Sequence, residues 1–179
     1  RPSAAREPSM DDLLWTRQLA DRAAYYVRGG KPRVGATIEV IVTGPAAPPP
    51  PPAAGGLVAP DVASTAPDAS AFTGVFRSVH VSVVESEEPA RGERGPLAIV
   101  LVPAAHAIGD VNAEEAARVH ALARSGVAAG RDVVVVACCH PRGAAAVAGR
   151  LAPEAAVLCA WEASRPMLEA AARAIVTTR

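Results

Sequence analysis

Short, almost unbroken apolar runs recur along the chain and are its strongest signal for β-strands. The run "DVVVVA" at 132–137 carries four successive valines, and "LAIVLV" at 97–102 is similar. Continuous runs of this length are typical of strands that are covered on both faces. Together with β-branched segments such as "TIEVIVT", they predict five strands, at 37–43, 75–84, 97–102, 132–137 and 155–160.

Apolar residues at helical spacing predict a first helix over 11–28. Ser9 is placed to accept hydrogen bonds from the first turn, and Gly29-Gly30 is placed to end the helix. The apolar stripe of this helix consists of Trp15, Leu19, Ala23, Tyr26 and Val27.

Three further helices are predicted between and after the later strands, at 112–130, 143–150 and 164–176. Asn112 and Ser164 are expected to cap the first and the last of them.

The alternation of strands and helices predicts the α/β class, as a three-layer α/β/α sandwich with a mainly parallel sheet. One segment stands apart, a Pro-rich connector at about 45–71, in which residues 48–52 are all proline and offer no N–H to a ladder. We expect residues 1–30 to form an entry linker and helix, and residues 31–179 to form a single sandwich domain.

The charge balance, the length of the apolar runs and the cysteine content indicate which partners and which compartment to expect. Basic and acidic residues number 18 each, so no net field attracts nucleic acid. The apolar runs are too short to cross a membrane, which takes about 20 residues. Three cysteines, two of them adjacent, favour a reducing compartment over a disulfide framework. We expect a cytoplasmic protein; because the sequence begins at Arg1 without Met, a fragment is expected, and a signal ahead of it would instead direct export.

Ligands of parallel sheets bind beyond the carboxyl ends of the strands. There "ACCHP" places Cys138, Cys139 and His140 directly after a strand, where a helix N-terminus could lower the pKa of a thiol. A cysteine-dependent hydrolase would use Cys138 or Cys139 as nucleophile, with His106, after an adjacent strand, as the better placed base. Two small buried cysteines ending a strand are the alternative, and the one that we favour.

Other chemistry is disfavoured by spacing. Three adjacent residues cannot wrap a tetrahedral zinc ion, so we expect no metal. Neither a dinucleotide fingerprint nor a phosphate-binding loop follows the first strand, so we expect no cofactor. The paired glutamates at 87–88 and 114–115 are explained by solvation and by a helix first turn.

Two stretches resemble the C-terminal α/β domain of glycoside hydrolase family 3. "LWTRQLADRAAYYVRGGKPRVGATIEVIVTGP" is similar to the family's entry helix, short turn and first strand. "DVVVVACCHPRGAAAVAGRLAPEAAVLCAWEASRPMLEAAARAIV" is similar to its valine-rich strand, short helix, next strand and closing helix. Trp161-Glu162 falls where the family often has an aromatic residue and a polar turn.

This resemblance implies an accessory domain that packs on a catalytic (β/α)8 barrel, in the same chain or in another. The family's nucleophilic aspartate lies on that barrel, which 179 residues cannot also encode, so no catalytic residue is expected here. Few insertions make the bacterial β-N-acetylglucosaminidase-like branch the closer likeness, with amino-sugar glycans as substrates. The expected barrel or ligand contacts are His106, Cys139, His140 and Glu162. A non-catalytic protein-binding scaffold domain and the cysteine hydrolase remain the alternatives.

Overall fold

The structure is a computed structural model of the 179-residue chain. It describes residues 9–29, 37–43, 69–76, 78–83, 95–102, 111 and 113–176. Most of the predicted Pro-rich connector, His106 and the expected cap Asn112 lie outside these residues. The division of the chain at residue 30 therefore stays a prediction.

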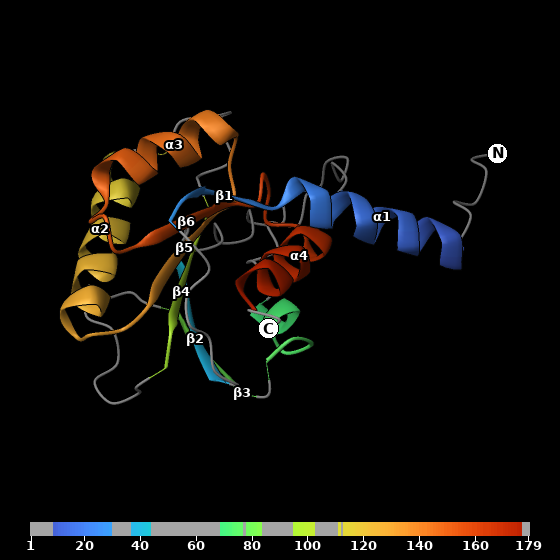
Figure 1. Cartoon of the computed structure of the whole chain (residues 1–179), viewed down its shortest axis with the longest axis horizontal. Helices are drawn as coiled ribbons and strands as arrows, with labels where there is room; N and C mark the ends of the chain where they lie inside the picture. Colours follow the sequence, from blue (N-terminus) through green and yellow to red (C-terminus); the bar gives the residue numbers. More distant parts are fainter. Residues whose placement is uncertain are drawn as a thin grey trace, which may run out of the picture.

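The described residues form strands and helices in alternation (Figure 1). The strands are β1 (Tyr25–Arg28), β2 (Thr37–Thr43), β3 (Ser78–Val83), β4 (Leu97–Leu101), β5 (Val133–Ala137) and β6 (Ala156–Cys159). The helices are α1 (Met10–Ala23), α2 (Ala113–Ala128), α3 (Pro141–Arg150) and α4 (Arg165–Ile175), with a short 3-10 helix η1 (Ala69–Phe72). All five predicted strands are present.

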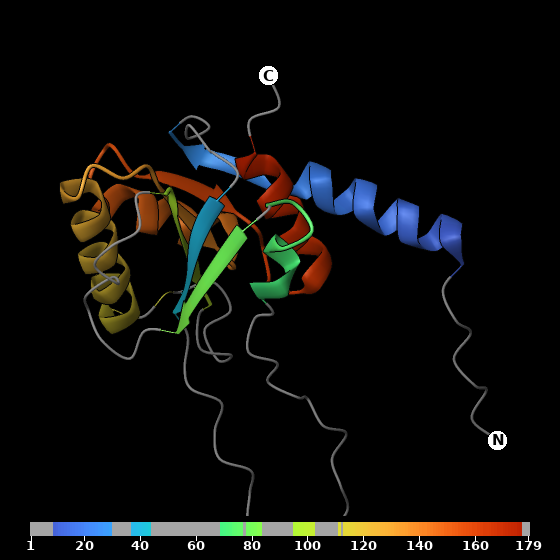
Figure 2. The same cartoon turned by 90° about the horizontal axis from the view of Figure 1, so that it is seen from below.

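The six strands form one sheet in the order β1-β6-β5-β4-β2-β3. Strands β2 to β6 pair in parallel, and β1 alone runs antiparallel, against β6. Helices α2 and α3 cover one face, whereas α4, η1 and the C-terminal half of α1 cover the other (Figures 1 and 2). The predicted α/β sandwich with a mainly parallel sheet is thus confirmed.

Each central strand buries side chains on both faces, as the unbroken apolar runs require. In β4, Ala98 and Val100 belong to the core beneath α4, while Leu97, Ile99 and Leu101 belong to the core beneath α2 and α3. Each of the buried Leu, Ile and Val side chains contributes about 1.5–3 kcal/mol by leaving water. Small residues let the layers approach closely: a Cβ added to Gly126 of α2 would lie 2.8 Å from Val133 Cγ2 and 2.9 Å from Leu97 Cδ2.

The predicted first helix is wrong at its C-terminal end. Helix α1 ends at Ala23, and Tyr25–Arg28 forms β1, in which Tyr25 pairs with Cys159 and Tyr26 with Leu158. Tyr and Val favour strands, and β6 would otherwise present an unpaired edge. Gly29, with φ 79°, follows the strand rather than the helix.

The buried side of α1 also differs from the predicted stripe. Ala20 and Ala24 pack into the core shared with α4, while Trp15 is 62% and Leu19 49% exposed. Asp21 of α1 accepts from Arg173 of α4 at 2.7 Å, which fixes the two helices together. Small alanines, rather than the large residues, therefore form the contact with the domain.

Two of the predicted caps can be compared with the structure. Ser9 caps α1 in a capping box, since its hydroxyl accepts from the Asp12 N–H while the Asp12 carboxylate accepts from the Ser9 N–H. Ser164 occupies the N-cap position of α4 but makes no side-chain hydrogen bond there. Helix α3 begins at Pro141, two residues before the predicted start, because His140 caps it.

Arg28, at the end of β1, binds the C-terminal end of α3. Its guanidinium donates to the backbone carbonyls of Ala148, Leu151, Ala152 and Ala155. Carbonyls at a helix end lack intrahelical partners and carry partial negative charge. A single side chain therefore satisfies them and joins the edge strand to the helix layer.

No helix within the described ranges is long and apolar enough to cross a membrane.

Candidate functional site

The sheet is doubly wound, with strand order 2-1-3-4-5 when β2 is counted as the first parallel strand. The order reverses between β2 and β4, and the connecting elements η1 and α2 lie on opposite faces on either side of this point. Doubly wound sheets bind ligands at such a point, beyond the carboxyl ends of the strands. The residues that follow β2 and β4, at 44–50 and 103–110, lie outside the described residues, and His106 is one of them.

The described part of this edge consists of the residues after β5 and β6. The ladders extend one residue past the strands, since the Cys138 N–H donates to Leu101 O and the Ala160 N–H to Ala137 O, both at 2.9 Å. His140 and Trp161 then emerge side by side. Their rings meet edge to face, with centroids 5.7 Å apart.

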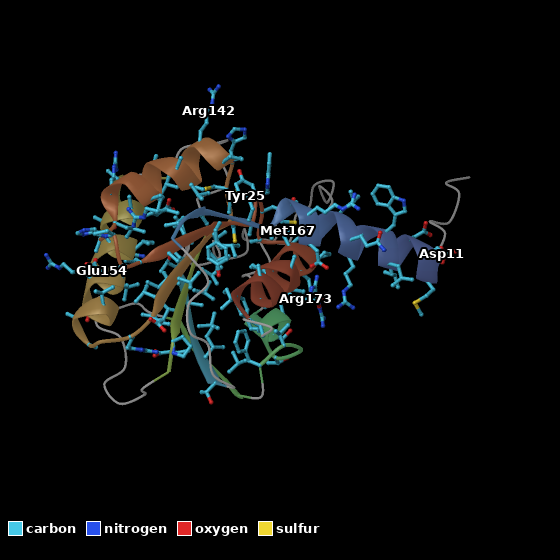
Figure 3. The ribbon with its side chains drawn as sticks, viewed as in Figure 1. Asp11, Tyr25, Arg142, Glu154, Met167 and Arg173 are labelled. Carbon is cyan, nitrogen blue, oxygen red and sulfur yellow. The ribbon has the colours of Figure 1, made fainter. Side chains whose placement is uncertain are left out.

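His140 is exposed and oriented by its own helix. Its Nδ1 accepts from the Arg142 N–H at 3.2 Å, which caps α3 and leaves the ring proton on Nε2. Arg142 itself points outward from the start of α3 (Figure 3). The imidazole thus presents an N–H at the surface and no acceptor.

Trp161 was not among the predicted contacts, yet it is the most conspicuous side chain here. It is 46% exposed and has φ 56°, the only positive φ of a non-glycine residue within the described part. Such a conformation costs about 1–3 kcal/mol. Its place directly after an apolar strand was the available sequence signal. Glu162, which was predicted, follows it and is exposed.

The two adjacent cysteines lie on opposite faces of the sheet. Cys138 belongs to the core beneath α4 and Cys139 to the core beneath α3, and each is 5% exposed. Burial, and secondarily the neighbouring Cys139, Cys159 and Glu162, raise the pKa of the Cys138 thiol. Burial, with a smaller effect of Cys159, raises the pKa of Cys139 to about 11.

A cysteine nucleophile needs the opposite conditions, an accessible thiol with a lowered pKa. The Cys138 thiol lies 4.0 Å from Val136 O, and Cys159 donates to Cys139 O at 3.5 Å. In the described part of the chain no hydrogen bond joins a cysteine sulfur to the His140 ring. These observations count against the cysteine-dependent hydrolase.

Among the residues that the structure describes, no three His, Cys, Asp or Glu side chains gather as a metal ion would require.

A buried ion pair among the described residues lies away from this edge. Glu39 of β2 accepts from Arg131 at 2.5 Å, and Arg131 also donates to Gly95 O at 2.7 Å. Both side chains are buried. Glu39 pairs with Leu97, the first residue of β4, so this pair joins the amino-terminal ends of the strands, where doubly wound sheets do not bind ligands.

The described residues therefore define a doubly wound α/β domain with an aromatic and polar carboxyl edge. No family model and no curated protein matches the chain. Among solved structures, the chain is similar to part of the β-N-acetylglucosaminidase from Thermotoga maritima, with a TM-score of 0.49 and 12% identity. The match covers 96% of this chain and 33% of that one, so the chain spans about a third of that protein's length.

Proposed function

We propose that this chain is an accessory α/β domain of a family 3 glycoside hydrolase of the β-N-acetylglucosaminidase-like branch. It packs on a catalytic (β/α)8 barrel and carries little or no catalysis itself. The proposal rests on the sequence resemblance and on one structural observation, the exposed apolar residues in the N-terminal half of α1.

Helix α1 continues its packing side beyond the domain. Ala20 and Ala24 pack on the core beneath α4. Leu13 lies seven residues before Ala20, and Met10 lies three residues before Leu13. At these spacings both lie on the same side of the helix as the two alanines, nearer its N-terminus. Figures 1 and 2 both show this half of α1 projecting clear of the sheet and of α4. We name Met10, Leu13 and Leu14 the overhang.

All three overhang residues are at least half exposed. An exposed apolar patch of this kind on a helix marks a surface that binds another protein or domain. A preceding domain joined through an entry helix is such a body, and this supports the barrel as partner.

The carboxyl edge supplies the proposed ligand contacts. His140 and Glu162 are exposed there and could donate to and accept from an amino-sugar glycan or the barrel. His106 stays a predicted contact of the same edge. Cys139 is buried, so its proposed part is to hold the edge rather than to touch a ligand.

The test compares this chain with the longer polypeptide that its reading frame encodes, using a chromogenic N-acetylglucosaminide. We expect no turnover by the isolated chain and turnover when a barrel precedes it. Leu13→Asp in the longer polypeptide should lower activity or separate the domains on limited proteolysis. Leu19→Asp, on the opposite and also exposed side of α1, should not.

Robust turnover by the isolated chain would overturn the proposal. A reading frame that encodes no barrel, in cells where no barrel copurifies, would favour the non-catalytic protein-binding scaffold, which the exposed side of α1 also supports.

A further inference from the structure

The side of α1 that faces away from the domain carries a second apolar feature, separate from the overhang. Asp12, Trp15, Leu19 and Arg22 are spaced three, four and three residues apart and so form one stripe along the helix. All four are exposed, Trp15 at 62%. We name these four residues the Trp15 stripe.

The order of residues in the Trp15 stripe is self-complementary. An acid begins it, a base ends it, and two apolar residues lie between. When a second α1 runs antiparallel across it about a two-fold axis, Asp12 faces Arg22 of the second copy and Trp15 faces its Leu19. A two-fold interface pairs the same patch on both subunits in this way. A parallel pair would instead place acid beside acid and base beside base.

From this arrangement we infer that the Trp15 stripe binds a second copy of this chain, with the two α1 helices antiparallel. The contact consists of two Trp15–Leu19 pairs in the centre and two Asp12–Arg22 ion pairs at the ends. It leaves the overhang on the other side of the helix, so the dimer and the proposed barrel contact are compatible.

The acidic end of the stripe is held in place before any partner arrives. The Asp12 carboxylate accepts from the Ser9 N–H at 2.8 Å and from the Ser9 hydroxyl at 2.7 Å, through a single oxygen. The other oxygen can accept from a guanidinium. Hydrogen bonds from Ser9 also lower the pKa of Asp12, so the carboxylate stays charged at neutral pH.

The contact is small, so the dimer is expected to be weak. Fourteen residues of α1 span about 21 Å, and a pair of such helices buries less than the roughly 1,600 Å² of a standard interface. We expect a dissociation constant on the order of 10–100 μM.

Two leucines of α1 provide a matched comparison, because Leu19 lies in the stripe at 49% exposure and Leu14 outside it at 50%. Sedimentation equilibrium of the whole chain should show a monomer–dimer equilibrium. Leu19→Ala should raise its dissociation constant about tenfold, since one methyl-rich contact is lost on each side of the axis. Leu14→Ala should change it less than about twofold. Equal effects of both, or a monomer up to about 500 μM, would overturn the proposal.

A charge exchange tests the antiparallel order. Asp12→Lys and Arg22→Glu each place like charges together and should each abolish the homodimer. Mixed in equal amounts, the two variants restore both ion pairs and should form a heterodimer. Because Asp12→Lys also removes the capping box, circular dichroism first establishes that α1 is retained; failure of two folded variants to associate on mixing contradicts the antiparallel pairing.

Discussion

At the scale of single residues, the burial of the thiols counts against a cysteine nucleophile. Cys138 and Cys139 follow β5 directly, at the start of a helix, which is where an activated cysteine is often found. Their side chains nevertheless point into the two cores rather than toward solvent. Alternation along an extended segment dictates this placement, because neighbouring side chains of a strand lie on opposite faces.

Iodoacetamide should therefore label the native chain far more slowly than the chain unfolded in urea at pH 7.5. A raised pKa means that less thiolate is present at neutral pH, so labelling of Cys139 should keep accelerating as the pH approaches about 11. Mass spectrometry of labelled peptides measures both effects. If the native chain were labelled at neutral pH as fast as free cysteine, the result would favour the cysteine-dependent hydrolase.

At the scale of elements, helix α2 lies so close to the sheet that a methyl group decides the fit. Gly126 faces Val133 and Leu97 at distances below 3 Å for an added Cβ. In an open helix position the replacement of Gly by Ala stabilises by about 1 kcal/mol. In a filled core, overpacking costs about 1–3 kcal/mol.

Gly126→Ala should thus destabilise the domain by up to about 2 kcal/mol. Gly149→Ala in α3 is the matched control, because nothing lies within 4 Å of its added Cβ, and it should stabilise by up to about 1 kcal/mol. Urea unfolding of both variants provides the comparison. A stabilised Gly126→Ala would mean that α2 can move away from the sheet.

Elements also show how far sequence patterns reach. The strands after residue 96 were predictable because two-sided burial demands unbroken apolar runs. The end of α1 was not, because Tyr26 and Val27 continue a helical spacing without any Gly or Pro before them, and only β6, more than 120 residues later, makes them a strand. Likewise, periodicity could not show that Trp15 is exposed while Ala20 is buried.

At the scale of the whole molecule, one ion pair joins the amino-terminal side of the sheet. Arg131, just after α2, reaches Glu39 of β2 and the carbonyl of Gly95 before β4. Removing one partner of a buried pair leaves the other charged and desolvated, at a cost of about 3–5 kcal/mol.

Glu39→Ala should therefore lower the free energy of unfolding by about 3–5 kcal/mol. Glu114→Ala, which breaks the exposed pair with Arg118 of α2, should cost less than about 1 kcal/mol. Denaturant midpoints at constant slope measure both. Similar costs for the two variants would show that water reaches the Glu39–Arg131 pair.

The site itself could be predicted only in outline. Parallel topology placed His140 and Glu162 at the carboxyl edge, and both are exposed there. The contact between His140 and Trp161 could not be read from residues 21 positions apart, since it depends on the register of β5 against β6. The buried state of Cys139 follows from α3, which packs over it.

The position of β1 has a consequence for synthesis. A ribosome makes Tyr25–Arg28 among the first described residues, but their partner β6 is made more than 120 residues later. Until then the first strand has no neighbour, and pairings between such distant segments form slowly. This edge of the sheet therefore stays open until β6 has been made, and β1 can close it only from that point of synthesis onward.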